Sequence, residues 1–130
     1  MVTADMTVEL DLPVRADSVA RARRGLERLR GRLAEPLFED LRLLISEVVT
    51  NSLRHAGLTS SDRVDVVVSA RPSHVHAEVF DHGPGFDVRD DPPDAGAASG
   101  WGLFLVEQVS DRWGVDRVHG RTRVWFELDR

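Results

Sequence analysis

The amino-acid sequence predicts an α+β fold, a two-layer sandwich in which helices pack on one face of a mostly antiparallel sheet. Segments with the alternation of strands follow one another without an intervening helix, and the expected element order is βααββαββ. Successive strands favour antiparallel pairing over the parallel sheet of a Rossmann-like fold. A length of 130 residues suits one hydrophobic core, so we expect a single domain spanning residues 1–130.

The first half of the chain predicts one strand and two helices. Residues 6–12 alternate polar and apolar side chains, as a half-buried strand does. Asp17 is a candidate N-cap for a helix in which apolar residues recur at spacings of three and four as far as Leu33. Pro36 suits the first turn of a second helix, which we expect to run to about Ala56 and to stop at the following glycine.

The second half predicts a hairpin, a loop, a helix and two final strands. The strand-like segments are 63–70, 74–81, 112–120 and 122–130. Residues 82–99 are dominated by Gly, Pro, Asp and Ala, which predicts a loop. A helix is expected to begin at Gly102 and to end near Ser110.

Composition excludes several functional classes. The chain contains no Lys, which excludes a Walker-type P-loop and Schiff-base chemistry, and no Cys, which excludes disulfides and thiolate nucleophiles. A net charge of -5 disfavours direct nucleic-acid binding. The apolar runs are too short to span a bilayer, and the first ten residues lack the features of a signal peptide. We therefore expect a cytoplasmic protein with no membrane or nucleic-acid partner.

Glu47, Asn51 and His55 form the first group of residues that could carry chemistry. They are four residues apart on the second predicted helix and share one line along it. Asn51 is the only Asn in the chain, and Asn has poor helix propensity, so its position suggests a specific role. The alternative for Glu47 and His55 is an ordinary solvated helix face.

Each of the other two groups contains a pair of glycines. One pair follows an acidic residue at a strand end, and the other pair lies at the start of a helix. Asp81 ends a predicted strand and is followed by Gly83 and Gly85, which allow a close backbone approach to a ligand or simply a tight turn. Gly100 and Gly102 precede a helix whose first N–H groups are unpaired and suit an anion. A third glycine and a preceding strand are lacking, so we reject a dinucleotide fingerprint.

Two further patterns have simpler interpretations. His74 and His76 form an H-x-H pair on one side of a strand, but no third metal ligand is identifiable, and we favour ordinary strand positions. The segment 15–32 carries seven Arg residues, which could contact an acidic partner. A solvated helix face is the more common reason for such a stripe.

The order of the three motifs resembles the ATP-binding domain of the Bergerat-fold (GHKL) superfamily, which gyrase-type ATPases, Hsp90, sensor histidine kinases and MutL-type proteins share. The motifs are a helical E-x-x-x-N (Glu47, Asn51), a strand-end D-x-G-x-G (Asp81), and G-x-G at a helix start (Gly100, Gly102). The size and the ending VWFEL look most like the anti-sigma-factor serine/threonine kinases and their stand-alone actinobacterial relatives.

This resemblance implies ATP and Mg²⁺ as cofactors and a role for each matching residue. Asn51 would hold Mg²⁺, and Glu47 would be the catalytic general base. Asp81 would recognise the adenine amino group. The other residues expected to contact the nucleotide are Gly83, Gly85, Gly100, Gly102, Leu103 and Thr122.

The resemblance further implies partner switching. Such a regulator binds a sigma factor and phosphorylates a STAS-type anti-sigma antagonist, and the analogy suggests a homodimer built around the first strand and helix. Related kinases often carry a basic residue just before the second glycine motif, where this chain has Ala98 and Ser99. The alternative is therefore a catalytically weak or inactive module in which ATP gates protein binding. A detached histidine-kinase catalytic domain is a third option, disfavoured because no helical hairpin with a phosphoacceptor His is recognisable.

Overall fold

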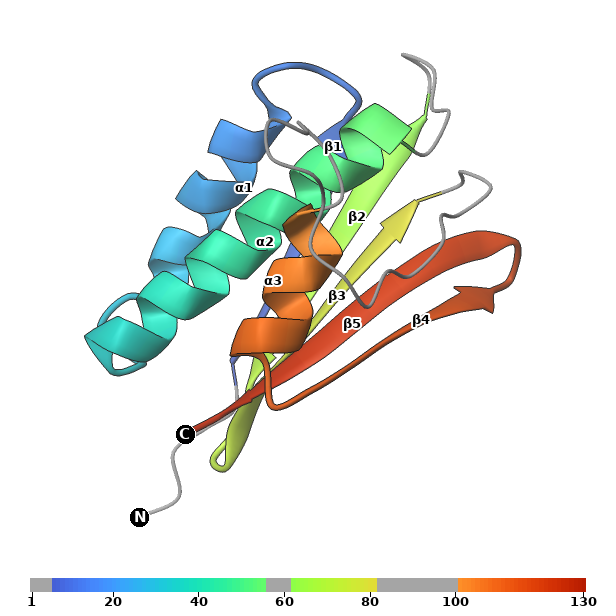
Figure 1. Cartoon of the computed structure of the whole chain (residues 1–130). Coiled ribbons are helices and arrows are strands. Elements are labelled where there is room, and N and C mark those ends of the chain that lie inside the picture. Colours follow the sequence, from blue (N-terminus) through green and yellow to red (C-terminus); the bar gives the residue numbers. More distant parts are fainter. Residues whose placement is uncertain (1–5, 56–61, 82–100) are drawn as a thin grey trace.

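The computed structural model describes residues 6–55, 62–81 and 101–130 (Figure 1). The elements follow one another as β1 (Met6–Pro13), α1 (Ser18–Leu26), a 3-10 turn η1 (Glu27–Leu29), α2 (Glu35–His55), β2 (Arg63–Ala70), β3 (His74–Asp81), α3 (Trp101–Val109), β4 (Arg112–Val118) and β5 (Arg121–Asp129). The predicted order βααββαββ is confirmed.

The strands form one five-stranded sheet in the order β1-β2-β3-β5-β4. Each neighbouring pair is antiparallel. The three α-helices lie on one face of this sheet, with α2 between α1 and α3 (Figure 1). The predicted α+β sandwich is therefore confirmed, and the sheet is antiparallel throughout.

The hydrophobic core lies between the sheet and the helices. Strands β2, β3 and β5 alternate buried and partly exposed residues, so every second side chain points toward the helices. Fully buried members include Val66, Val79 and Phe126 from the sheet and Leu41 and Ile45 from α2. Burying each such side chain contributes about 1.5–3 kcal/mol, and the aligned apolar rows fix the strand register.

The first helix is shorter than the sequence predicts. Apolar spacing suggested a helix as far as Leu33, but α1 ends at Leu26 and the chain passes through η1 to Gly31, whose φ is 87°. A left-handed residue cannot continue an α-helix, and glycine adopts this conformation without steric cost. Leu29 and Leu33 are nevertheless buried. Their helical spacing therefore reflects contact with the core, although the residues do not belong to one continuous helix.

Asp17 occupies the predicted N-cap position of α1 but does not cap it with its side chain. Its carboxylate accepts hydrogen bonds from Arg15 at 3.1 and 2.9 Å and pairs with Arg21 at 3.3 Å. The hydrogen-bonded guanidinium of Arg15 lowers the pKa of Asp17 below its usual range. The capping part of the prediction is wrong because these arginines take the carboxylate oxygens.

The other boundaries agree closely with the predictions. α2 contains Pro36 in its first turn, and β2 and β3 match the predicted hairpin strands. α3 begins one residue before the expected Gly102. Ala56 and the loop expected at 82–99 lie outside the described residues. None of the described helices is long and apolar enough to cross a membrane.

Candidate functional site

Glu47 and Asn51 lie on the side of α2 that faces away from α1. The Arg23 guanidinium of α1 donates to the Ser46 hydroxyl of α2 at 2.8 Å, which identifies the side of α2 that faces α1. At 100° per residue, Asn51 lies about 140° around the helix from Ser46. Figure 1 shows α1 and α3 on opposite sides of α2, so this second side is the side of α3.

Asn51 is only 8% exposed, whereas Glu47 is half-buried. Within the described part of the chain, neither side chain has a hydrogen-bond or ion-pair partner. A largely buried residue whose amide makes no bond within the described residues is a good candidate for a ligand contact. The helix therefore presents an acid and an amide, one turn apart, with polar atoms available to a ligand.

Asp81 and Thr122 lie opposite each other at one end of the sheet. Asp81 is the last residue of β3, and Thr122 is its register partner on β5. Each is 1% exposed, and both point to the face covered by the helices. In Figure 1 the C-terminal ends of α2 and β3 lie at the same end of the molecule, and α2 packs on both β3 and β5.

Arg117 extends this pair into a row across three strands. It is the register partner of Thr122 on β4, and its Nη1 donates to Thr122 Oγ1 at 2.7 Å. Its Nη2 donates to the carbonyl oxygen of Gly120 at 3.1 Å. The sequence analysis did not identify Arg117. On β4, Arg117 is four residues after the partly buried Trp113, so both side chains lie on the same face of the strand. This spacing would have predicted that Arg117 points inward.

The remaining predicted nucleotide contacts stay predictions. Gly83, Gly85 and Gly100 lie outside the described residues, so their roles stay predictions. Gly102 is the second residue of α3, where backbone N–H groups lack partners within the helix. Leu103 is 4% exposed and belongs to the hydrophobic core, and its role toward a nucleotide also stays a prediction.

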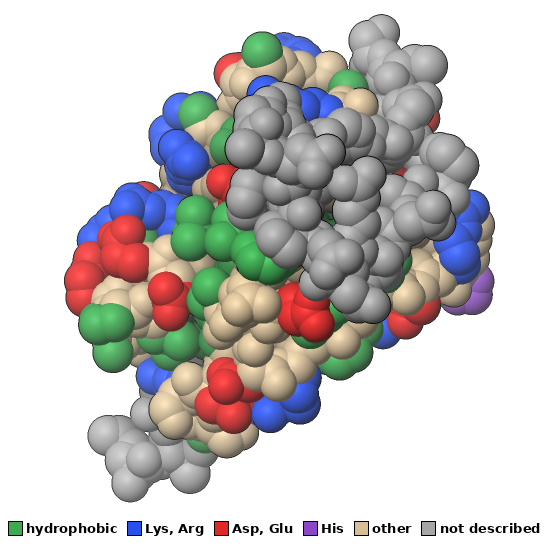
Figure 2. All heavy atoms as spheres, in the orientation of Figure 1, with side chains coloured by type: hydrophobic (Ala, Val, Ile, Leu, Met, Phe, Trp, Pro, Cys, Tyr) green, Lys and Arg blue, Asp and Glu red, His purple; other side chains and the backbone are tan. Residues whose placement is uncertain are grey.

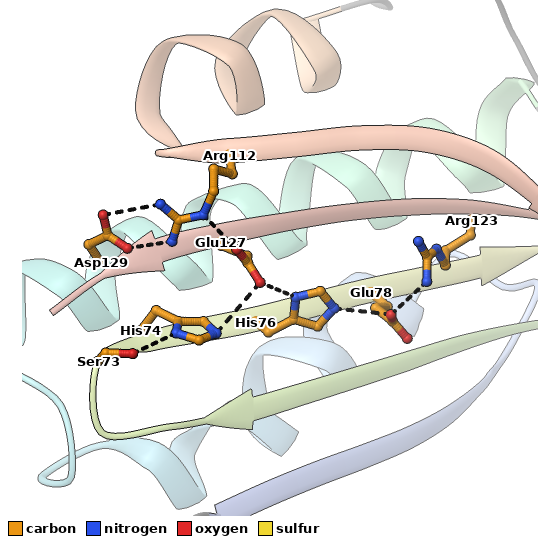
Figure 3. A network of polar contacts seen from close by, with 8 residues as sticks. All are labelled: Ser73, His74, His76, Glu78, Arg112, Arg123, Glu127 and Asp129. Carbon is orange, nitrogen blue, oxygen red and sulfur yellow. Dashed lines mark hydrogen bonds and ion pairs between the residues drawn. The ribbon is translucent and has the colours of Figure 1, made fainter.

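The opposite face of the sheet carries the H-x-H pair in an ion-pair network (Figure 3). The ring of His76 lies between two carboxylates, with Nδ1 2.8 Å from Glu127 Oε2 and Nε2 3.0 Å from Glu78 Oε1. His74 Nε2 lies 3.5 Å from the same oxygen of Glu127. Among the described residues, no group of three or more His or acidic side chains is arranged to hold a metal ion. These contacts favour ordinary strand positions for both histidines.

Arg112 anchors this network at the edge strand. It donates to Glu127 Oε1 at 2.7 Å and to Asp129 Oδ1 at 2.5 Å. The pKa of Glu127 is lowered, chiefly by the hydrogen bond from Arg112 and further by the bond with His76. The hydrogen bond from Arg112 also lowers the pKa of Asp129. The network stabilises the ionised carboxylates and so contributes to a charged, solvent-facing surface.

The arginines of segment 15–32 line the α1 edge of the helical layer. Figure 2 shows basic side chains there, with acidic ones among them. Arg30 pairs with Glu27 at 2.7 Å, whereas Arg24 and Arg28 are exposed and have no ion-pair partner in the described residues. This mixture of paired and solvated charges is typical of an exposed helix face.

Comparison with known proteins identifies the family. The sequence model of the histidine kinase-like ATPase domain family matches residues 12–128, and this range includes almost every described element. The chain belongs to the histidine kinase-like ATPase domain family. The recognition of this superfamily from the three motifs is thereby confirmed.

Curated relatives of this histidine kinase-like ATPase domain include serine-protein kinases named RsbW. The protein from Oceanobacillus iheyensis is 24% identical over 127 residues, covering 87% of this chain and 80% of the relative. The protein from Listeria monocytogenes serovar 1/2a is 29% identical over 125 residues, covering 85% and 80%.

Two solved structures share the fold. The RsbU and RsbW domains of Rv1364c from Mycobacterium tuberculosis match with a TM-score of 0.67 and 19% identity, over 97% of this chain and 32% of that one. The histidine kinase domain of the blue-light activated histidine kinase EL346 from Erythrobacter litoralis matches with a TM-score of 0.57 and 23% identity, over 89% and 60%. The present chain thus spans about a third of the first structure. At these identities, the likeness confirms the fold alone.

The side chains of this ATPase domain fit a nucleotide and a metal ion. The Asp81 carboxylate can accept a hydrogen bond from an amino group of a base, and Thr122 adds a hydroxyl beside it. The Asn51 amide oxygen is a ligand of the type that Mg²⁺ accepts, and it has no partner among the described residues. These groups are buried beside a largely apolar helix–sheet interface, which suits the exclusion of water from a bound ligand.

Proposed function

We propose that this chain is an ATP- and Mg²⁺-binding anti-sigma regulator that acts as a protein serine/threonine kinase in partner switching. One surface would bind a sigma factor, and phosphorylation of a STAS-type antagonist would control its release. Membership of the ATPase-domain family and likeness to serine-protein kinases support the proposal. The observation that carries it is the burial of Asn51, Asp81 and Thr122 at positions that match the motifs of the superfamily.

Each residue has a defined task in this proposal. Bound ATP supplies the phosphoryl group, and phosphoryl transfer depends mainly on positioning and charge stabilisation. Asn51 holds the metal ion, and Asp81 accepts a hydrogen bond from the base. Glu47 takes the proton from the attacking hydroxyl, for which its carboxylate, on the same line of α2 and without a partner among the described residues, is suited. The N-terminus of α3 at Gly102 faces anionic groups favourably because its N–H groups are unpaired.

Thermal unfolding with and without ATP and Mg²⁺ tests the binding step. A ligand at about 100 times its dissociation constant adds about 2.7 kcal/mol to the free energy of unfolding, which shifts the midpoint by several degrees. We expect a Mg²⁺-dependent shift in the wild type and none in Asn51→Ala. Thr50→Ala is the matched control, because Thr50 is the adjacent polar residue on the α1 side of α2, where its hydroxyl bonds Ser46 O at 2.7 Å. Absence of a shift in the wild type at millimolar ATP would contradict the proposed nucleotide site.

Radiolabelled phosphate transfer tests the kinase step. The purified chain is incubated with labelled ATP and candidate STAS-type antagonists, and sigma-factor binding is measured in parallel. We expect label on a Ser or Thr of one antagonist and release of the sigma factor on its addition. A folded, ATP-binding chain that neither labels an antagonist nor binds a sigma factor would contradict the regulatory role. The homodimer and the cytoplasmic location stay predictions.

An ATP-gated binding module without phosphoryl transfer is the second candidate function. Ala98 and Ser99 favour it, because related kinases often have a basic residue at this place before the second glycine motif. In this case ATP would shift the unfolding midpoint and change partner affinity, but no label would be transferred. A Glu47→Ala variant would then regulate its partner as the wild type does, whereas loss of regulation would favour catalysis.

A further inference from the structure

Ser52 places a buried hydroxyl on the face of α2 that packs on the sheet. The same row of the helix, at spacings of three and four residues, otherwise holds Leu41, Ile45 and Val48. All four residues are at most 1% exposed. Within the described part of the chain, Ser52 Oγ has no hydrogen-bond partner. Burial of a hydroxyl without a bond costs stability, so its presence in an apolar row requires an explanation.

Other hydroxyls of the same helix are bonded to its backbone. Ser46 Oγ donates to the Arg42 carbonyl oxygen at 2.6 Å, and Thr50 Oγ1 donates to the Ser46 carbonyl oxygen at 2.7 Å. A bond to the carbonyl four residues earlier is a common way for a helical Ser or Thr to satisfy its hydroxyl. The Val48 carbonyl oxygen is the equivalent acceptor for Ser52, and this bond does not form. The Ser52 hydroxyl is therefore not committed to its own helix.

Ser52 lies at the end of the helix–sheet interface that also holds Asp81. It is in the last turn of α2, next to Asn51, and Asp81 is the last residue of β3. α2 packs on β3, and Figure 1 shows the C-terminal ends of both elements at the same end of the molecule. Ser52 and Asp81 are both buried on the facing sides of helix and sheet. The polar residues of the proposed nucleotide site therefore continue onto the sheet-facing side of α2.

We infer that the Ser52 hydroxyl binds the base of ATP by donating a hydrogen bond to a ring nitrogen that flanks the amino group. The inference rests on the proposed ATP site, in which Asp81 accepts a hydrogen bond from that amino group. A carboxylate offers only lone pairs, whereas adenine also presents ring nitrogens that need a donor. A serine hydroxyl supplies this donor, either directly or through a bridging water. Asp81 and Ser52 together match both the donor and the acceptor of the base.

This role gives a reason for a hydroxyl that costs stability in the free protein. Binding sites often contain groups that lower stability and gain their partner only when the ligand is bound. Removal of the Ser52 hydroxyl should therefore have opposite effects on two properties. The affinity for ATP should fall, whereas the stability of the nucleotide-free chain should not. A hydroxyl that faces only a buried water would leave the affinity unchanged.

Calorimetric titration of the wild type and Ser52→Ala with ATP and Mg²⁺ tests the inference. We expect the dissociation constant to rise about tenfold in the variant, which corresponds to one hydrogen bond. The unfolding midpoint of the nucleotide-free variant should be no lower than that of the wild type. Thr50→Ala is the matched control, because the Thr50 hydroxyl is bonded within the helix, and its dissociation constant should equal that of the wild type. An unchanged dissociation constant in Ser52→Ala overturns the inference.

ATP analogues test whether the hydroxyl contacts a ring nitrogen. In 1-deaza-ATP and 7-deaza-ATP, a C–H group replaces one of the two ring nitrogens that flank the amino group. With one of these analogues, Ser52→Ala should cause no further loss of affinity, because the acceptor is already absent. With the other, the loss should equal that measured with ATP. A full loss with both analogues overturns the inference, because the hydroxyl would then affect affinity by another route.

The outcomes separate this inference from the proposed function. A wild type that binds no ATP overturns both. A wild type that binds ATP, with binding lost in Asn51→Ala and unchanged in Ser52→Ala, overturns the inference and leaves the ATP site intact. A lower affinity in Ser52→Ala together with a lower unfolding midpoint of the nucleotide-free variant also overturns it, because the hydroxyl would then support the fold of the site and not the base.

Discussion

The indole of Trp125 on β5 lies across Gly114, its register partner on β4. A Cβ at position 114 would fall 2.6 Å from the indole Nε1 and 2.9 Å from Cε2. The His76 ring stacks near the same indole, with ring centroids 5.9 Å apart and planes at 20°. Glycine at position 114 therefore lets an edge strand accept a large aromatic side chain on the solvent-facing side of the sheet, a cross-strand pairing that stabilises strand edges.

Gly114→Ala should reduce the free energy of unfolding by about 1–3 kcal/mol, because a rigid ring would have to move. Urea denaturation measures this change. In a Trp125→Val background the same substitution should cost much less, since the obstructing indole is gone. Equal costs in the two backgrounds would show that Gly114 is required for another reason.

Arg112→Met should lower stability at neutral pH, and this loss should shrink in acid. The pKa values of Glu127 and Asp129 are lowered by their bonds to Arg112. Carboxylates with lowered folded-state pKa values contribute stability above their unfolded pKa of about 4, and this contribution is lost as the pH falls through the folded values. Thermal midpoints of the variant and the wild type should therefore converge below about pH 4.

Arg24→Met is the control for this pH series. Arg24 is exposed on α1 and has no ion-pair partner in the described residues, so its loss should not change the pH dependence of the midpoint. A difference between Arg112→Met and the wild type that is independent of pH would mean that packing of the arginine stem, and not charge, supplies its contribution.

Ser52→Ala should stabilise the protein. Ser52 Oγ is fully buried in α2 and, among the described residues, has no hydrogen-bond partner. Removal of an unsatisfied buried hydroxyl and the higher helix propensity of Ala together should add about 1 kcal/mol to the free energy of unfolding. Ser46→Ala on the same helix should have the opposite effect, because Ser46 Oγ bonds both the Arg42 carbonyl oxygen and Arg23 Nε. Destabilisation by Ser52→Ala would indicate a partner, such as water, in solution.

The sequence contains most of the information for the fold because side-chain periodicity depends on burial. The segment 63–70 is rich in β-branched residues and is followed by a turn signal, which located β2, and Val64, Val66 and Val68 are its buried positions. The periodicity of apolar residues gave a wrong end for α1. Leu29 and Leu33 contact the core at helical spacing, although the helix ends before them. Apolar periodicity depends on which side chains are buried. A bend that keeps the same side chains buried leaves the apolar periodicity nearly unchanged, so the sequence pattern does not show the bend.

The candidate site was predictable in part. Glu47 and Asn51 are on one helix, so their common line followed from spacing alone. Asp81 and Thr122 are far apart in sequence, and only the resemblance to a family joined them, because strand register depends on pairing that no local pattern specifies. The bond from Arg117 to Thr122 depends on the same register and was missed for that reason.

Glu47→Gln should separate nucleotide binding from phosphoryl transfer. Gln keeps the size and hydrogen-bonding reach of Glu but cannot take a proton at neutral pH, so ATP and Mg²⁺ should still raise the unfolding midpoint as in the wild type. Transfer to the antagonist should fall at least about 100-fold, which is the usual contribution of a general base. Asp40→Asn is the control, because Asp40 is an exposed carboxylate two turns earlier on the same side of α2. Its transfer rate should equal that of the wild type. An unchanged rate in Glu47→Gln would exclude the general-base role, whereas loss of the ATP-induced shift would mean that Glu47 serves the bound nucleotide or its metal ion instead.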